Sequence, residues 1–95
     1  MKITNWDIVD HLKTEKDIEE FLEVVFEEGD TEFIPMALGA VARARKLMSK
    51  AAKHAGVGRE SLYHSLSKGG NPEFRTVFSV MDTLGYKLIP SRKVS

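Results

Sequence analysis

The sequence predicts an all-α domain of five helices followed by a short C-terminal β-strand. Two observations predict this fold class. Apolar residues recur at spacings of three and four along most of the 95 residues, which is the period of an amphipathic helix. Glycine and proline residues separate these stretches and mark the ends of helices. The length and a hydrophobic content of 42% allow one domain with a small core, which dimerisation would help to stabilise.

The first predicted helix follows Thr14-Glu15-Lys16-Asp17, which resembles a capping box with aspartate in place of the usual glutamate. Behind it, apolar residues at i, i+3, i+4 and i+7 form a stripe that ends near Gly29. The stripe consists of Ile18, Phe21, Leu22 and Val25. Before the capping box, Thr4 to Leu12 is expected to form no more than a short helical turn.

A second helix is predicted from Thr31 or Pro35 to about Lys46. Pro35 belongs in its first turn, because proline has no N–H to donate within a helix. The buried stripe of this helix consists of Ile34, Ala37, Leu38 and Val41. Gly39 indicates either a weak point in the helix or a place where another helix approaches closely.

Two short helices are predicted next. Ser49 is a suitable N-cap for a helix that ends at Ala55. Gly56 terminates this helix, because glycine readily takes the left-handed conformation. Gly58 then allows a new helix from Arg59 to Ser67.

The last predicted helix has Asn71 as its N-cap and Pro72 at its first position. Gly85 ends it, and its apolar face consists of Phe74, Val77, Phe78 and Met81. Tyr86-Lys87-Leu88-Ile89 alternates apolar and polar side chains. This alternation predicts a short strand that Pro90 stops.

Charge divides the chain into two halves. Met1 to Ile34 contains eleven acidic and three basic residues, a net charge of −8, whereas Pro35 to Ser95 has a net charge of +8. We therefore expect an acidic N-terminal helical segment, residues 1–30, packed on a basic domain, residues 31–95. A basic surface suits a polyanion, and an acidic surface suits a basic protein.

The composition excludes several functions. The chain has no cysteine, which rules out disulfides, thiolate catalysis and cysteine metal sites. Its three histidines show no metal-binding spacing, so we expect neither a metal nor a cofactor. The acidic run has no neighbouring nucleophile, so we expect no enzyme. No apolar stretch resembles a membrane span or a signal peptide, so we expect a cytoplasmic protein.

The segment from Lys50 to Leu66 has the spacing of a helix-turn-helix motif. Such a motif needs a small residue where the helices cross, a glycine four positions later, and an apolar residue six positions further on. The motif positions are held by Ala52, Gly56 and Leu62, with Val57 as the apolar residue of the turn. An ordinary helical hairpin in a core has the same spacing, so the surrounding side chains must distinguish the two.

The surrounding side chains favour DNA binding. The second helix of the pair presents long polar side chains, at the end that reaches base edges in such motifs. These predicted base-reading residues are Arg59, Glu60, Tyr63 and His64. The predicted phosphate contacts are basic residues and residues at helix starts, namely Ser49, Lys50, Lys68, Asn71 and Arg75.

Two of these assignments have alternatives. Tyr63 could instead pack against Leu66 and Phe74 at the rim of the core. Glu60 could serve only as a charge partner of Arg59 or as a favourable acid in the first helical turn.

Three stretches carry a resemblance to a known family: "FLEVVFEEGDTEFIPMALGAVARARK", "AAKHAGVGRESLYHSLSKGGNPEFRTV" and "VMDTLGYKL". In this order they resemble the HigA-type addiction-module antidotes, a branch of the lambda-repressor-like (Xre-type) helix-turn-helix proteins. The resemblance covers about three quarters of the chain, from Asp17 to Leu88. The family motif often begins with serine or threonine followed by glutamine. Here Lys50 follows Ser49, and lysine contacts a phosphate as a point charge.

The resemblance implies a five-helix lambda-repressor-like domain and a homodimeric antitoxin of a type II toxin–antitoxin module. Such a protein binds operator DNA, represses its own operon and neutralises a toxin of the RelE/ParE superfamily. We expect the acidic helix to bind the toxin through its stripe of Phe21, Leu22 and Val25 and through Glu19, Glu20, Glu23 and Glu27. The alternative is a free-standing repressor without a toxin partner, in which the domain's own core uses the stripe.

A two-fold symmetric protein matches a palindromic operator, so we expect a dimer interface. Val80 and Leu84 are expected to be exposed on the last helix, near Tyr86 and Leu88 of the predicted strand. An unpaired strand edge is a natural template for its symmetry mate.

Overall fold

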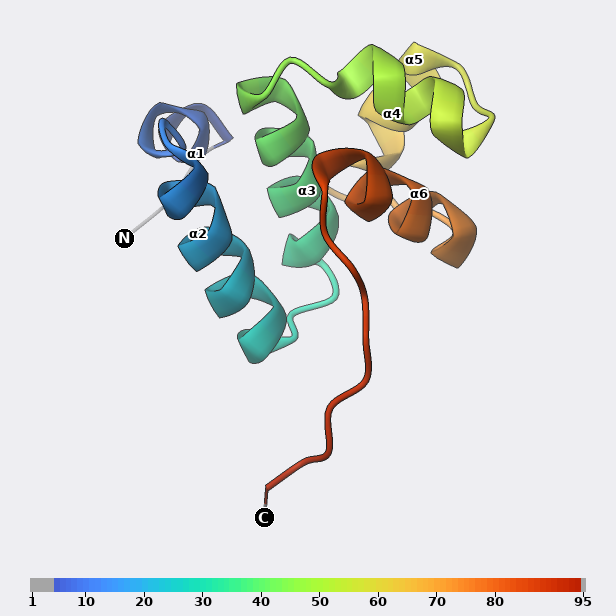
Figure 1. Cartoon of the computed structure of the whole chain (residues 1–95). Helices are drawn as coiled ribbons and strands as arrows, with labels where there is room; N and C mark the ends of the chain where they lie inside the picture. Colours follow the sequence, from blue (N-terminus) through green and yellow to red (C-terminus); the bar gives the residue numbers. More distant parts are fainter. Residues whose placement is uncertain (1–4, 95) are drawn as a thin grey trace.

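The computed structural model describes residues 5–94, which form six α-helices and, within that range, no β-strand (Figure 1). The helices are α1 (Asn5–His11), α2 (Glu15–Glu28), α3 (Phe33–Ala44), α4 (Met48–Ala55), α5 (Arg59–Ser65) and α6 (Phe74–Leu84). The predicted all-α class is confirmed, but the prediction of five helices and a C-terminal strand is wrong.

The additional helix is α1, where only a turn was expected; Thr4 lies outside the described residues. Ile8 and Leu12 from this segment are buried in the same core as the rest of the chain. A seven-residue helix has little stability alone, so this packing is what stabilises it.

The capping box at the start of α2 is confirmed. The Thr14 hydroxyl accepts a hydrogen bond from the Asp17 backbone N–H, and the Asp17 carboxylate accepts one from the Thr14 backbone N–H, both at 3.0 Å. The bond from the Thr14 backbone is the largest cause that lowers the pKa of Asp17 below its usual value. Ile18, Leu22 and Val25 of the predicted stripe are buried, so α2 uses this face for the core.

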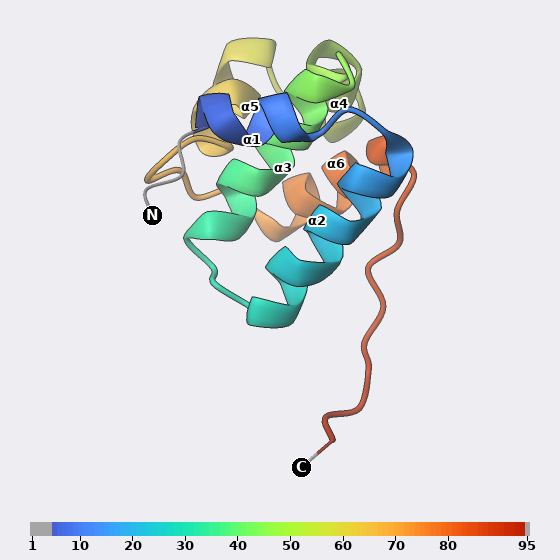
Figure 2. The same ribbon diagram turned by 90° about the vertical axis from the view of Figure 1, so that its left-hand side faces the viewer.

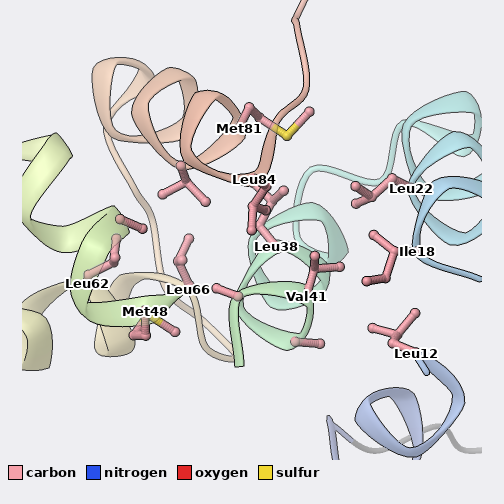
Figure 3. Packing of buried hydrophobic residues seen from close by; sticks show 14 of the residues in the cluster. Leu12, Ile18, Leu22, Leu38, Val41, Met48, Leu62, Leu66, Met81 and Leu84 are labelled. Atoms are coloured by element: carbon pink, nitrogen blue, oxygen red, sulfur yellow. The ribbon is translucent and has the colours of Figure 1, made fainter. Parts of the chain in front are cut away.

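Helix α3 runs through the middle of the core. Figure 3 shows its Leu38 and Val41 between the side chains of α2 on one side and those of α5 and α6 on the other. Of the two alternatives for Gly39, the structure supports the close approach, because a Cβ atom there would lie 2.5 Å from the carbonyl oxygen of Leu66. A larger residue at this position would push α3 away from the end of α5.

The junction between α3 and α4 is tighter than predicted. Lys46 has a positive φ of 57°, and the next backbone N–H, that of Leu47, bonds to the Ala42 carbonyl at 2.8 Å. The chain re-enters a helix at Met48, whose side chain is buried. Ser49 is therefore not an N-cap but lies inside the first turn of α4, which is a correction to the sequence prediction.

The turn between α4 and α5 has the predicted form. Gly56 takes the left-handed conformation, with φ 73° and ψ 28°, which glycine adopts without steric cost. The Val57 backbone N–H bonds to the Ala52 carbonyl at 3.0 Å and closes the end of α4. Leu62 of α5 is fully buried, so α5 packs back onto the body of the protein.

Helix α6 begins later than predicted. The Glu73 carbonyl accepts the first helical bond, from Val77 at 3.1 Å, so Glu73 is the N-cap. Asn71 and Pro72 belong to the extended segment that leads into α6. Their predicted roles as cap and first helical residue are wrong.

The predicted buried face of α6 is also wrong in part. Phe74 is 74% exposed and Phe78 is 42% exposed, whereas Val80 and Leu84, which were expected on the surface, are buried. The sequence of this helix has two apolar stripes, and only one can face α3 and α4. The core takes the stripe with Val80, Met81 and Leu84.

The segment after Gly85 is extended but pairs with no strand among the described residues. Tyr86 and Leu88 are partly buried against the core, whereas Lys87 and Ile89 point to solvent. One-sided burial of an extended chain therefore produces the alternation that was interpreted as a strand. Figure 2 shows the tail passing beside α2 and then leaving the body of the protein.

Among residues 5–94, every helix is too short or too polar to cross a lipid bilayer.

Candidate functional site

The exposed side of α5 is the first candidate surface. Helices α4 and α5 lie together at one end of the molecule, away from α2 (Figure 1). The four side chains predicted to read bases are all exposed on α5, and we call them the α5 face: Arg59, Glu60, Tyr63 and His64. Burial of Leu62 and Leu66 fixes the rotation of α5, so this polar side points outward.

The structure distinguishes the two interpretations of Tyr63. Its side chain is 46% exposed, and its ring lies under the guanidinium group of Arg43, with 5.6 Å from the Arg43 Cζ atom to the ring centre. The Phe74 ring instead forms an edge-to-face contact with Phe78. Tyr63 is therefore a surface residue with a cationic neighbour, a geometry that is favourable for cation–π attraction.

Sequence reasoning did not assign a role to Arg43. This residue lies in the last turn of α3, and its guanidinium group contacts the Tyr63 ring of α5. No local pattern indicates the contact, because the two residues come from different helices. The only available signal was that Arg43 follows the buried run of α3 and is therefore near its end.

The residues predicted to contact phosphates are all exposed, but they lie in three different parts of the chain. Ser49 and Lys50 lie in the first turn of α4, Lys68 and Asn71 lie in the segment between α5 and α6, and Arg75 lies in the first turn of α6. Neither Ser49 nor Asn71 opens a helix, so the argument that their helix ends attract phosphate does not hold. The charges of the lysines remain available on the surface.

The exposed side of α2 is the second candidate surface. Its carboxylates form what we call the acidic face: Glu19, Glu20, Glu23 and Glu27, all exposed. The start of this helix is tied to the end of α3 by an ion pair between Glu15 and Arg45. This pair is largely exposed to solvent, so it contributes little to stability.

A shallow apolar groove adjoins the acidic face, and we call it the tail groove. It has a volume of about 350 Å³ and lies between α2 and the extended C-terminal segment. Its lining comes from α2, from Met81 of α6 and from the extended segment: Glu19, Leu22, Glu23, Phe26, Met81, Tyr86, Lys87, Leu88 and Ile89. The acidic face therefore has an apolar surface beside it, although the Leu22 and Val25 side chains that were expected to dock a toxin are buried in the core.

The pKa of Tyr86 is affected by its surroundings in the tail groove. Burial raises the pKa of its hydroxyl above the usual value near 10, and the negative charges of Glu15 and Glu19 raise it further. The tyrosine is therefore neutral over the whole physiological range. It contributes an apolar ring with a hydroxyl donor to the groove.

The predicted dimer residues do not form one surface. Val80 and Leu84 lie in the core, and Tyr86 and Leu88 lie against it beside α2. The apolar residues that α6 does expose are Phe74 and Phe78, whose ring centres are 4.8 Å apart.

Comparison with known proteins identifies the relatives of this chain. Residues 2–91 match the protein family described as "Probable addiction module antidote protein". An uncharacterized protein from Haemophilus influenzae is 43% identical over 83 residues, which cover 87% of this chain and 84% of that relative. No solved structure matches the chain significantly. A match along nearly the whole length places the protein in this family: the chain belongs to the probable addiction module antidote proteins.

Proposed function

We propose that the protein is the antitoxin of a type II toxin–antitoxin module, of the HigA type within the lambda-repressor-like helix-turn-helix proteins. It acts in the cytoplasm and has no enzymatic activity. As a dimer it binds operator DNA and represses its own operon, and it neutralises a toxin of the RelE/ParE superfamily. Membership of the antidote family is the observation that carries this proposal.

The DNA-binding part of the proposal rests on the α5 face. Helix α5 buries Leu62 and exposes the α5 face. Arginine, glutamate and other side chains that form hydrogen bonds are the types that contact base edges in recognition helices. Arg59 is placed to bond guanine, and Glu60 to accept from the cytosine amine. Exposed lysines on both sides, Lys50 and Lys68, supply the attraction to phosphate that does not depend on sequence.

The toxin-binding part rests on the acidic face. A toxin that cleaves RNA carries positive charge because its substrate is a polyanion, so a row of glutamates attracts it. Val24 is exposed beside the acidic face, and the tail groove offers further apolar surface. In this proposal, Val24 and the tail groove make the apolar contacts with the toxin, in place of the stripe of Phe21, Leu22 and Val25 that the core uses.

A free-standing repressor is the second candidate. The observation that favours it is the burial of Leu22 and Val25 and the partial burial of Phe21, because the core uses the stripe that a toxin was expected to cover. In that case the glutamates of α2 would serve solubility alone.

The association rate with a toxin separates the two candidates. The first protein to test is the product of the adjacent gene, which the antitoxin proposal expects to be a small basic protein. Electrostatic steering acts mainly on association and weakens as salt rises. Reversing Glu19, Glu20, Glu23 and Glu27 to lysine should slow capture strongly at low ionic strength and leave the helical circular dichroism unchanged. The control reverses Asp10, Glu32 and Glu73, which are exposed acids outside α2 and belong to none of the proposed binding surfaces. Capture of the basic protein at the wild-type rate by the α2 variant would exclude the acidic face, and failure of the unmodified chain to bind it would favour the repressor.

A further inference from the structure

Helix α6 has an exposed face that no part of the described chain covers. Phe74 and Phe78 are 74% and 42% exposed, and their rings contact each other edge to face at 4.8 Å. In Figure 1, the N-terminal end of α6 lies at the edge of the molecule on the side away from α2. Two neighbouring phenylalanines on an outer helix face are a costly surface for a monomer and typically mark an interaction site.

Charged residues flank the aromatic pair on the same side of the helix. At 3.6 residues per turn, positions 74, 75, 78 and 82 fall on one side of α6, opposite the buried Val80 and Leu84. Arg75 and Asp82 are both exposed. They stand two turns apart, with Phe78 between them. The face therefore has a positive end, an aromatic centre and a negative end.

This arrangement is complementary to itself. A two-fold axis that passes between Phe78 and Ser79 places a second α6 antiparallel to the first. Arg75 and Asp82 are equally distant in sequence from that axis, so each Arg75 lies opposite Asp82 of the partner subunit. The two copies of Phe78 meet at the centre, as an isologous contact requires.

We propose that the aromatic face of α6, made of Phe74, Arg75, Phe78 and Asp82, is the homodimer interface, and that its occupant is a second copy of this chain. The inference rests on the proposed function, which requires a dimer, and it names the surface that forms it. It also assigns Arg75 to the dimer interface, in place of the phosphate contact that the sequence predicted for this residue. Asp82 remains available although it pairs with His54 at 3.0 Å, because its side chain is mostly exposed.

The size of the interface sets its strength. One helix pair buries less than the roughly 1,000 Å² typical of stable interfaces. We therefore expect a reversible dimer that dissociates in the micromolar range. The same two-fold axis relates the two copies of the α5 face, as a palindromic operator requires.

Sedimentation equilibrium of the full chain tests the proposal by charge reversal. Arg75→Asp or Asp82→Arg alone should weaken dimerisation by about tenfold or more, because each places like charges opposite each other. The double variant with both reversals should recover the wild-type dissociation constant. Phe78→Ser should give a monomer, and the control Val24→Ser, which removes an exposed apolar residue from α2, should stay dimeric.

Two results would overturn the proposal, and they are distinguishable. A wild-type chain that remains monomeric at high concentration would remove both the interface and the dimer of the proposed function, while leaving toxin binding untouched. A dimer that withstands the single reversals and Phe78→Ser would refute only this interface. Recovery in the double variant could not arise from a merely structural effect of either residue.

Discussion

The guanidinium group of Arg43 on α3 lies over the ring of Tyr63 on α5, with 5.6 Å between the Arg43 Cζ atom and the ring centre. This contact restrains an exposed tyrosine on the helix that we propose to read DNA. It also joins α5 to α3 at a point outside the buried core. The contact therefore links the stability of the protein to the orientation of the α5 face.

A double-mutant cycle should detect this link. Arg43→Gln and Tyr63→Leu are each expected to destabilise the fold slightly, and the double variant should show a coupling energy of about 0.5–1 kcal/mol. Urea unfolding of the four proteins measures it. Strictly additive effects would mean that the two side chains are neighbours without a significant interaction.

Gly39→Ala should destabilise the protein by about 1–3 kcal/mol, the usual cost of overpacking. The added methyl group would meet the Leu66 carbonyl oxygen, a backbone atom that cannot move away as a flexible side chain can. Gly58→Ser is the matched control, because a Cβ atom at Gly58 has open space and serine is a good N-cap for α5. Thermal unfolding of both variants gives the comparison, and equal melting temperatures would contradict the close packing of α3 on α5.

Tyr86 should make the protein sensitive to alkaline pH. Its pKa is raised in the folded state, so the unfolded chain loses the proton first as the pH rises. The stability that this group contributes is present below about pH 10 and is lost as the pH rises through the higher folded-state value. Tyr86→Phe should remove this step from the pH profile of urea unfolding. An unchanged alkaline profile in the variant would assign the loss of stability to other groups.

The features that could be predicted from the sequence are those set by neighbouring residues. The Thr14–Asp17 capping box and the left-handed Gly56 depend on a few consecutive side chains, and both are present as expected. For Gly39 the sequence offered two alternatives, a weak point in the helix or a close approach, and the contact with the Leu66 carbonyl decides for the second. The exposed positions of Arg59 and its neighbours followed from the burial of Leu62.

The features that could not be predicted are those for which the local sequence allows two arrangements and tertiary packing selects one of them. Helix α6 has two apolar stripes, and the packing of α3 and α4 decides that Val80 is buried and Phe78 is exposed. Ser49 looks like an N-cap, but the positive φ of Lys46 lets the next helix start two residues earlier, with Leu47 as its N-cap. The contact between Arg43 and Tyr63 exists only once α3 and α5 have packed together.

The central claim is that one chain carries two separate binding surfaces, the α5 face for DNA and the acidic face for a toxin. The most direct test is one binding experiment with the immobilised chain, its own promoter DNA and the product of the adjacent gene, which the proposal expects to be a small basic protein. Arg59→Ala should lose about 1–3 kcal/mol of operator affinity per half-site and still capture the basic protein at the wild-type rate. The lysine variant at Glu19, Glu20, Glu23 and Glu27 should show the reverse, with slow capture and operator binding that is equal or tighter. Operator affinity that is unchanged in Arg59→Ala, or capture that is unchanged in the lysine variant, would contradict this division of the molecule.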